Sequence, residues 1–184
     1  ETDMVCFSIN WDRDPESLHK EILSVPPGIF TLLGGRYATE NPDHWLTTYP
    51  NVTAVVRGDG EEATEEICRG MPLEKITGLS YRKNGQIFHN PNRKVGPIRD
   101  DLFPIRRLRR HAYEVTLDGI DTGLSIDTVA ASRGCPFNCT FCSFSRNPWG
   151  EKRPWSGRSP ESVVEELAGI ESNVRDCIAL IRKI

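Results

Sequence analysis

Short apolar runs alternate with helix-start signals at the beginning of this chain, and that alternation is what most constrains its fold. The apolar runs are Met4–Ile9, Ile29–Leu33 and Val52–Val56, and each has the length expected of a buried strand. Between them, Asp14-Pro15-Glu16 and Asn41-Pro42-Asp43 each place a capping side chain before a proline and an acid. This order predicts an α/β fold with an open, doubly wound parallel sheet.

Small or polar residues follow each of these predicted strands. They are Ser8, Gly34-Gly35 and Gly58-Asp59-Gly60. The carboxyl ends of parallel strands form the ligand crevice of open α/β sheets, and glycine lets a ligand approach the backbone closely. Taken alone, the same glycines are better explained as ordinary strand-to-helix turns.

The middle of the chain reads as a hairpin followed by a linker. Ile76–Phe88 contains Asn84-Gly85 between alternating apolar runs, which predicts a type I′ turn. Asn90–Pro104 is rich in proline, asparagine and charge, which is typical of irregular structure. A basic run follows, and we expect it to be a solvated face of the linker; a contact to phosphate or carboxylate is the alternative. Its residues are Arg106, Arg107, Arg109 and Arg110.

Three cysteines, Cys135, Cys139 and Cys142, lie at CxxxCxxC spacing directly after Ser132-Arg133-Gly134. Three thiolates can hold three corners of a four-iron cluster and leave one iron without a protein ligand. The apolar run Leu124–Ala131 predicts a strand that leads into this loop, and Ser159-Pro160-Glu161 starts a helix after it. We expect Phe137 and Phe141 to shield the cluster from water.

Two other roles for the cysteines, a structural zinc site and a disulfide framework, have less support in the sequence. A structural zinc site normally takes four ligands from two paired motifs, whereas Cys6, Cys68 and Cys177 are scattered singly and His89 and His111 lack finger-like spacing. A disulfide framework is typical of small, cysteine-dense secreted chains, and 6 cysteines in 184 residues are not dense. An iron–sulfur electron-transfer or sensor module, with a fourth protein ligand, stays open as an alternative.

The amino-acid composition limits the classes of protein to which the chain can belong. The chain is 38% hydrophobic and 27% charged, as in ordinary soluble globular proteins. A net charge of −3 gives no global field that would favour nucleic acid. No apolar run approaches the roughly twenty residues that span a membrane. Thiolate chemistry of this kind suits a reducing compartment, so we expect a cytoplasmic protein.

The stretch Ser-Arg-Gly-Cys-Pro-Phe-Asn-Cys-Thr-Phe-Cys-Ser resembles the cluster motif of radical S-adenosylmethionine (SAM) enzymes. The resemblance implies that Cys135, Cys139 and Cys142 bind a 4Fe-4S cluster and that SAM chelates the fourth iron. It also implies that the backbone of Phe141 lies against the SAM adenine. One electron from the cluster would then cleave SAM and give a 5′-deoxyadenosyl radical. A methylthiotransferase of this class would carry a second set of cluster cysteines, which the scattered thiols do not supply.

The order of the glycine turns and the cluster motif resembles the cobalamin-binding-domain subgroup of these enzymes. The resemblance implies that Gly34 and Gly35 line the nucleotide tail of cobalamin, and that Ser8 matches the serine of a Ser-x-Leu/Thr signature. This chain has Asn10 at the third position of that signature, and the subgroup's Asp-x-His-x-x-Gly motif is missing. The implied chemistry is methyl transfer through cobalamin, or oxidative cyclisation or rearrangement, of a small molecule. A reductant such as flavodoxin or ferredoxin would supply electrons.

We therefore predict three segments. Residues 1–75 would be the C-terminal part of a Rossmann-like, cobalamin-binding-type sheet, residues 76–120 a hairpin and linker, and residues 121–184 the first βα unit of a radical SAM partial TIM barrel. A complete sheet of this type has about five strands, and one βα unit cannot close a barrel. We expect the chain to be an internal part of a longer enzyme and to be inactive alone.

Overall fold

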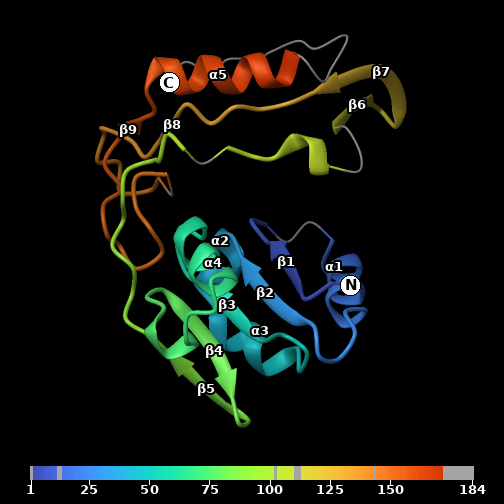
Figure 1. The fold of residues 1–184 in the computed structure, drawn as a ribbon, viewed down its shortest axis with the longest axis vertical. Helices are drawn as coiled ribbons and strands as arrows, with labels where there is room; N and C mark the ends of the chain where they lie inside the picture. The colour runs from blue at the N-terminus through green and yellow to red at the C-terminus, as the bar shows by residue number, and fades with distance from the viewer. Residues whose placement is uncertain (1, 12–13, 102, 110–112, 143, 172–184) are drawn as a thin grey trace. The chain divides into compact units, whose positions relative to one another are not determined.

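The computed structural model describes residues 2–11, 14–101, 103–109, 113–142 and 144–171 (Figure 1). The chain divides into two compact units. Unit 1 consists of residues 1–95 and 146–152, and unit 2 consists of residues 96–145 and 153–184. The chain therefore leaves unit 2 just after the cysteine loop, makes a short excursion in unit 1, and returns to unit 2 at Arg153.

Unit 1 is built on one sheet with the strand order β1-β2-β3-β4-β5. The first three strands are parallel, and the hairpin β4–β5 extends the sheet antiparallel to β3. The strands are β1 (Met4–Ser8), β2 (Phe30–Gly34), β3 (Ala54–Val56), β4 (Leu79–Lys83) and β5 (Gln86–His89). The three predicted parallel strands are confirmed, and Ser8 pairs with Gly34 at their carboxyl ends.

Helices cover both faces of this sheet, as a doubly wound fold requires. On β2, Leu33 faces a core formed with α1 and α3, while Leu32 faces a second core formed with α4. The helices are α1 (Pro15–Leu23), α2 (Arg36–Glu40), α3 (Pro42–Thr48) and α4 (Glu61–Cys68), with a short 3₁₀ helix η1 (Leu73–Lys75). Figure 1 shows α3 and α4 against the sheet in the blue-to-green part of the chain.

The predicted helix starts are confirmed in their capping contacts. Asp14 Oδ1 accepts a hydrogen bond from the backbone N–H of Ser17 at 3.1 Å, and Asn41 Oδ1 accepts one from His44 at 3.2 Å. The Asn84-Gly85 turn has positive φ at both residues, as type I′ requires. The hairpin belongs to the sheet and extends it beyond β3, whereas the sequence grouped the hairpin with the linker. No local sequence signal predicts its pairing with β3.

Trp149 belongs to the excursion of residues 146–152 and packs over the turn that follows β3. A Cβ built on Gly58 would lie 3.1 Å from the Trp149 ring, and Gly58 has φ +86°. The indole N–H donates to Glu151 Oε2 at 3.2 Å, and the Val95 N–H donates to Glu151 Oε1 at 3.4 Å. A residue larger than glycine at position 58 would displace Trp149.

Unit 2 has less regular structure. It contains a 3₁₀ helix η2 (Arg106–Leu108), the hairpin β6 (Tyr113–Leu117) and β7 (Ile120–Ile126), the short pair β8 (Ser132–Arg133) and β9 (Ser156–Gly157), and α5 (Pro160–Glu171). The predicted strand Leu124–Ala131 is wrong in its bounds, because Leu124 belongs to β7 and only Ser132–Arg133 pairs just before the cysteines. The Asp118-Gly119 turn, with both φ values positive, forms the hairpin that the sequence analysis missed. The end of the chain after Glu171 lies outside the described residues.

A buried network of ion pairs holds unit 2 together. Arg106 contacts Asp127 Oδ2 at 2.8 Å and Glu166 Oε1 at 2.6 Å, and Glu166 also pairs with Arg158. The side chains of Arg158 and Glu166 are only 2% and 3% exposed. Arg109 pairs with Asp127 as well, at 3.0 Å. The expectation of a solvated basic run is therefore wrong for Arg106 and Arg109; Arg110 lies outside the described residues.

This network predicts a loss of stability in acid. Burial alone would raise the pKa of Asp127, but hydrogen bonds from Arg109 and from the Thr128 N–H, with the charge of Arg106, lower that pKa below its usual value. A carboxyl whose pKa is lowered by folding stabilises the fold above its unfolded pKa of about 4, and that contribution is lost as pH falls through the folded pKa.

We therefore expect the free energy of unfolding to drop below about pH 4, and the variant Asp127→Asn to lack that part of the drop. Urea unfolding across a pH series measures both. An identical acid slope in the two proteins would contradict this role of Asp127.

Candidate functional site

The cysteine loop in unit 2 carries the three predicted cluster ligands. Cys135, Cys139 and Cys142 are free thiols; Cys139 is exposed and the other two are half-buried. Within the loop, the N–H of Cys142 donates a hydrogen bond to the carbonyl of Cys139 at 3.3 Å. The chain thus presents three thiols from one short, irregular segment.

The pair β8–β9 fixes the start of the loop. Arg153 O accepts a hydrogen bond from the Cys135 N–H at 3.2 Å, and Ala131 O accepts one from the Arg158 N–H at 2.9 Å. Gly134 lies between these contacts with φ +80°, and a Cβ built there would lie 2.1 Å from Pro154 O. Only glycine allows the two segments to approach so closely just before the first cysteine.

We expect Gly134→Ala to displace the cysteine loop. Gly119→Ala is a matched control, because Gly119 has the same φ of +80° but open space around a built Cβ. The control should lose about 1–2 kcal/mol of unfolding free energy from backbone strain alone, and Gly134→Ala should lose more because the backbone must move. Urea unfolding and amide exchange at Cys135 measure the difference. Equal losses would contradict the close approach at Pro154.

The loop supplies a suitable donor set without a preformed metal geometry. Among the described residues, no three His, Cys, Asp or Glu side chains lie close enough together to hold a metal ion. Cysteine thiolates are nevertheless the ligands that iron–sulfur clusters use, and all three thiols are unpaired by disulfides. The residues fit a cluster by their chemistry, and binding would have to draw the thiols together.

The aromatic side chains of the loop are exposed to solvent. Phe137 and Phe141 are 70% and 91% exposed, and Phe144 is also exposed. That Phe137 and Phe141 cover a bound cluster stays a prediction. The role of the Phe141 backbone at the SAM adenine stays a prediction.

The three residues predicted to contact cobalamin lie together at the carboxyl edge of the sheet in unit 1. Ser8 is the register partner of Gly34, and Gly35 follows directly as the residue before α2. Gly35 has φ +91°, and a Cβ there would lie 2.6 Å from Ile9 O, so glycine is required by the local packing. A Cβ on Gly34 would meet nothing within 4 Å, so the backbone at Gly34 is open to a ligand.

Two residues that the sequence did not single out organise this edge. Asn10 donates from its amide to Ser8 Oγ at 3.2 Å and accepts from the Arg36 N–H at 3.1 Å. Thr39 Oγ1 donates to Gly35 O at 2.8 Å and accepts from the Gly58 N–H at 3.1 Å. Asn10 was noted only as a departure from a signature, and the long-range contact of Thr39 has no local sequence signal.

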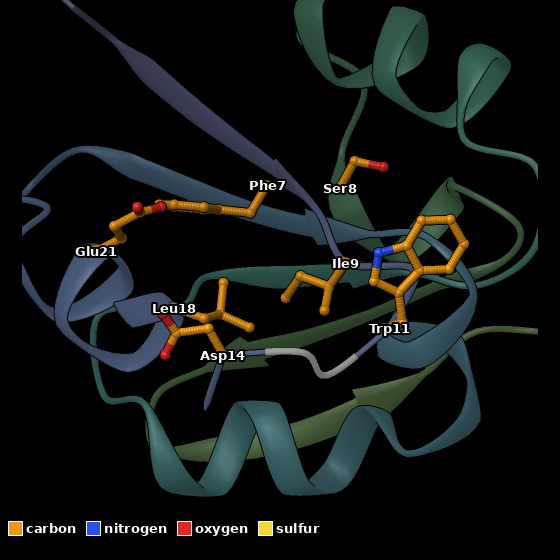
Figure 2. A pocket seen from close by; sticks show the side chains of 7 residues that line it. All are labelled: Phe7, Ser8, Ile9, Trp11, Asp14, Leu18 and Glu21. Atoms are coloured by element: carbon orange, nitrogen blue, oxygen red, sulfur yellow. The ribbon is translucent and has the colours of Figure 1, made fainter. Parts of the chain in front are cut away.

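A cavity of about 240 Å³ lies beside Ser8 (Figure 2). Its lining combines apolar side chains with a hydroxyl and two carboxyl groups, and comprises Phe7, Ser8, Ile9, Trp11, Asp14, Leu18 and Glu21. Figure 2 shows the Ser8 side chain pointing away from those of Phe7 and Ile9, as alternation along a strand requires. Gly34 and Gly35 are not part of this lining, so the cavity and the glycine turn are separate features.

A serine–histidine–aspartate chain in unit 1 resembles a hydrolase triad only superficially. His89 Nδ1 lies 2.9 Å from Ser80 Oγ, and His89 Nε2 lies 3.2 Å from Asp43 Oδ1. Ser80 is completely buried, so its hydroxyl cannot reach a substrate. These contacts connect α3 to the hairpin β4–β5.

No described helix of either unit is long and apolar enough to cross a membrane.

No family model matches the chain, but individual proteins do. It is 34% identical to an uncharacterized methyltransferase of Pyrococcus horikoshii, over 84% of this chain and 33% of that protein. It is 30% identical to the hopanoid C-3 methylase of Methylococcus capsulatus, over 92% and 32% of the two chains. It is 27% identical to the anaerobic magnesium-protoporphyrin IX monomethyl ester cyclase of Cereibacter sphaeroides, over 83% and 25%.

Two solved structures share the fold. One is the radical SAM methyltransferase TsrM from Kitasatospora setae with cobalamin and a [4Fe-4S] cluster bound, with a TM-score of 0.58, 16% identity, and coverage of 96% of this chain and 36% of that one. The other is the cobalamin-dependent SAM radical enzyme OxsB with aqua-cobalamin and SAM bound, with a TM-score of 0.59, 20% identity, and coverage of 92% and 23%.

The chain spans between a quarter and a third of the length of the curated relatives it matches. Neither the electron-transfer module nor the zinc module is favoured by these comparisons. The matches instead cover both the sheet of unit 1 and the cysteine loop of unit 2, because they extend over most of the chain. By sequence and by fold, the chain is a homologue of the radical SAM enzymes that carry a cobalamin-binding domain.

Proposed function

We propose that this chain is part of a radical SAM enzyme that uses a 4Fe-4S cluster and cobalamin. The observation that carries the proposal is the cysteine loop: three free thiols at CxxxCxxC spacing, with the first anchored by the Gly134–Pro154 approach. The relatives that support it are methyltransferases and a cyclase. The proposed reaction is methyl transfer to, or oxidative cyclisation or rearrangement of, a small molecule.

In this proposal Cys135, Cys139 and Cys142 each supply one thiolate to the cluster, and no protein side chain takes the fourth iron, which is left for SAM. When bound, the cluster would supply the single electron that cleaves SAM reductively. The loop backbone at Phe141 would lie beside the adenine. The protein's own task is to hold the thiolates in place and to orient the cofactors.

The first test is metal content. The protein is reconstituted anaerobically with iron and sulfide, then analysed for iron, sulfide and zinc, and assayed for 5′-deoxyadenosine after reduction with SAM present. We expect about four irons per chain. Zinc in place of iron, or no bound metal, would overturn the proposal. Because the relatives are three to four times longer, the 5′-deoxyadenosine assay is performed on the complete protein.

Cobalamin would bind at the carboxyl edge of the sheet in unit 1. Ser8 and Gly34 are paired there, the Gly34 backbone is open, and Thr39 joins the Gly35 and Gly58 turns. Such an edge is where open α/β sheets bind ligands. The side chains of Asn10 and Thr39 would hold the Ser8 hydroxyl and the glycine turns in position.

Gly34→Ala tests this placement. The added methyl group meets no protein atom within 4 Å, so stability should be unchanged while binding of hydroxocobalamin, followed by absorbance, weakens. Gly96→Ala is the control, because a Cβ there also meets nothing within 4 Å and Gly96 lies in unit 2. Equal cobalamin affinity in the two variants would overturn the role of Gly34.

The remaining assignments follow from the same proposal. A small electron-transfer protein such as flavodoxin or ferredoxin would deliver the electron, and the substrate would be a small molecule. A reducing cytoplasm suits an enzyme whose cluster ligands are thiolates.

A further inference from the structure

Ser145 is the only residue of the cysteine region, among those described, whose side chain is fully buried. It is 1% exposed, although Cys139, Phe141 and Phe144 nearby are exposed. A serine is mostly found at the surface, and a buried hydroxyl normally has hydrogen-bond partners. Its partners identify what it does.

The hydroxyl of Ser145 contacts two of the three cysteine residues. It lies 3.2 Å from Cys139 O and 3.1 Å from Cys142 O, and it can donate to either carbonyl. A trans peptide is planar, with its C=O and N–H on opposite sides. Fixing the Cys139 carbonyl therefore also fixes the direction of the Thr140 N–H, in the stretch between the second and third cysteines.

The backbone of Ser145 reaches the remaining cysteine. Its carbonyl accepts a hydrogen bond from the Arg153 N–H at 2.9 Å, and Arg153 O in turn accepts one from the Cys135 N–H at 3.2 Å. A single residue thus connects to all three cysteines, two through its side chain and one through the backbone of Arg153.

We propose that Ser145 is a positioning residue for the iron–sulfur cluster, holding Cys139 and Cys142 through its hydroxyl and Cys135 through Arg153. This inference rests on the proposed function, because it requires the three cysteines to bind a cluster. Groups that hold metal ligands in place typically change metal affinity or activity about 10- to 100-fold when they are removed. Backbone orientation near the cluster sulfurs also affects the reduction potential.

The test compares Ser145→Ala with Thr122→Ala in the reconstituted protein. Thr122 is a matched control because it lies in the same unit and its hydroxyl also donates to a backbone carbonyl, that of Val115 at 2.6 Å, within the β6–β7 hairpin. The measurements are the rate of iron loss to an iron(II) chelator, the midpoint potential of the cluster, and amide exchange of the metal-free protein over residues 139–142.

We expect Ser145→Ala to lose iron about tenfold faster than wild type, with a shifted midpoint potential and faster exchange over residues 139–142, while Thr122→Ala behaves as wild type in all three measurements. Iron loss and exchange equal to wild type, or equal effects in both variants, would overturn the inference. If wild type itself binds no iron, the proposed function fails. In that case exchange in the metal-free protein still decides whether Ser145 holds the loop.

Discussion

Replacing any one of Cys135, Cys139 and Cys142 by alanine is expected to reduce bound iron from about four per chain to less than one after anaerobic reconstitution. The physical reason is that a cluster held by three thiolates loses a third of its protein ligands with each replacement. Iron and sulfide analysis of each purified variant measures the effect.

Cys6→Ala and Cys68→Ala are matched controls for these variants. Both are free, exposed cysteines in unit 1, so they test whether loss of any thiol reduces iron uptake. We expect them to bind as much iron as wild type. Full iron content in Cys139→Ala, or equal losses in the controls, would show that the cysteine loop does not hold the cluster.

The second large effect is on stability. Glu166→Ala should lower the free energy of unfolding of unit 2 by about 3–5 kcal/mol, because it leaves a buried positive charge without its partner. Glu166 accepts from both Arg106 and Arg158, and the Arg158 side chain is only 2% exposed. Urea unfolding monitored by signals from unit 2 measures this loss.

Asp101→Ala is the matched control. Asp101 pairs with Arg99 at 2.6 Å in the same unit, but its side chain is 66% exposed. Exposed ion pairs contribute little to stability because water and salt screen them. We expect this variant to unfold close to wild type, and a similar loss in the two variants would contradict the claim that burial makes Glu166 important.

The parts of the fold that local sequence specifies were predictable. Asp14 and Asn41 cap their helices through their own side chains, and Asn84-Gly85 adopts the positive φ values that a type I′ turn needs. These features depend on residues close together in the chain. The three parallel strands were predictable because their apolar runs are bounded by polar or turn-forming residues.

Most of the features that were not predicted depend on contacts between distant residues. The pairing of β4 with β3 joins the hairpin to the sheet, and nothing in residues 76–88 specifies β3 as the partner strand. Arg106 was expected to face water, but its partners Asp127 and Glu166 lie 21 and 60 residues away. The Asp118-Gly119 turn is the exception, because an Asp-Gly pair with positive φ at both residues is a local feature.

The candidate site likewise has a part that the sequence predicts and a part that it does not. The spacing of Cys135, Cys139 and Cys142 identified the cluster ligands as a prediction, because metal ligation depends on residue type and separation. The residues that hold the ligands could not be identified in this way. Ser145 is an ordinary serine in sequence, and only its burial and its contacts with Cys139 and Cys142 distinguish it.

The central claim is that the cysteine loop leaves one iron of its cluster open for SAM. Electron paramagnetic resonance of the reduced, reconstituted complete protein, recorded with and without SAM, tests this most directly. We predict a cluster signal that changes on addition of SAM and that disappears in Cys139→Ala. A cluster signal in the complete protein that is the same with and without SAM would contradict the account, because it would mean that the fourth iron is not available to the cofactor.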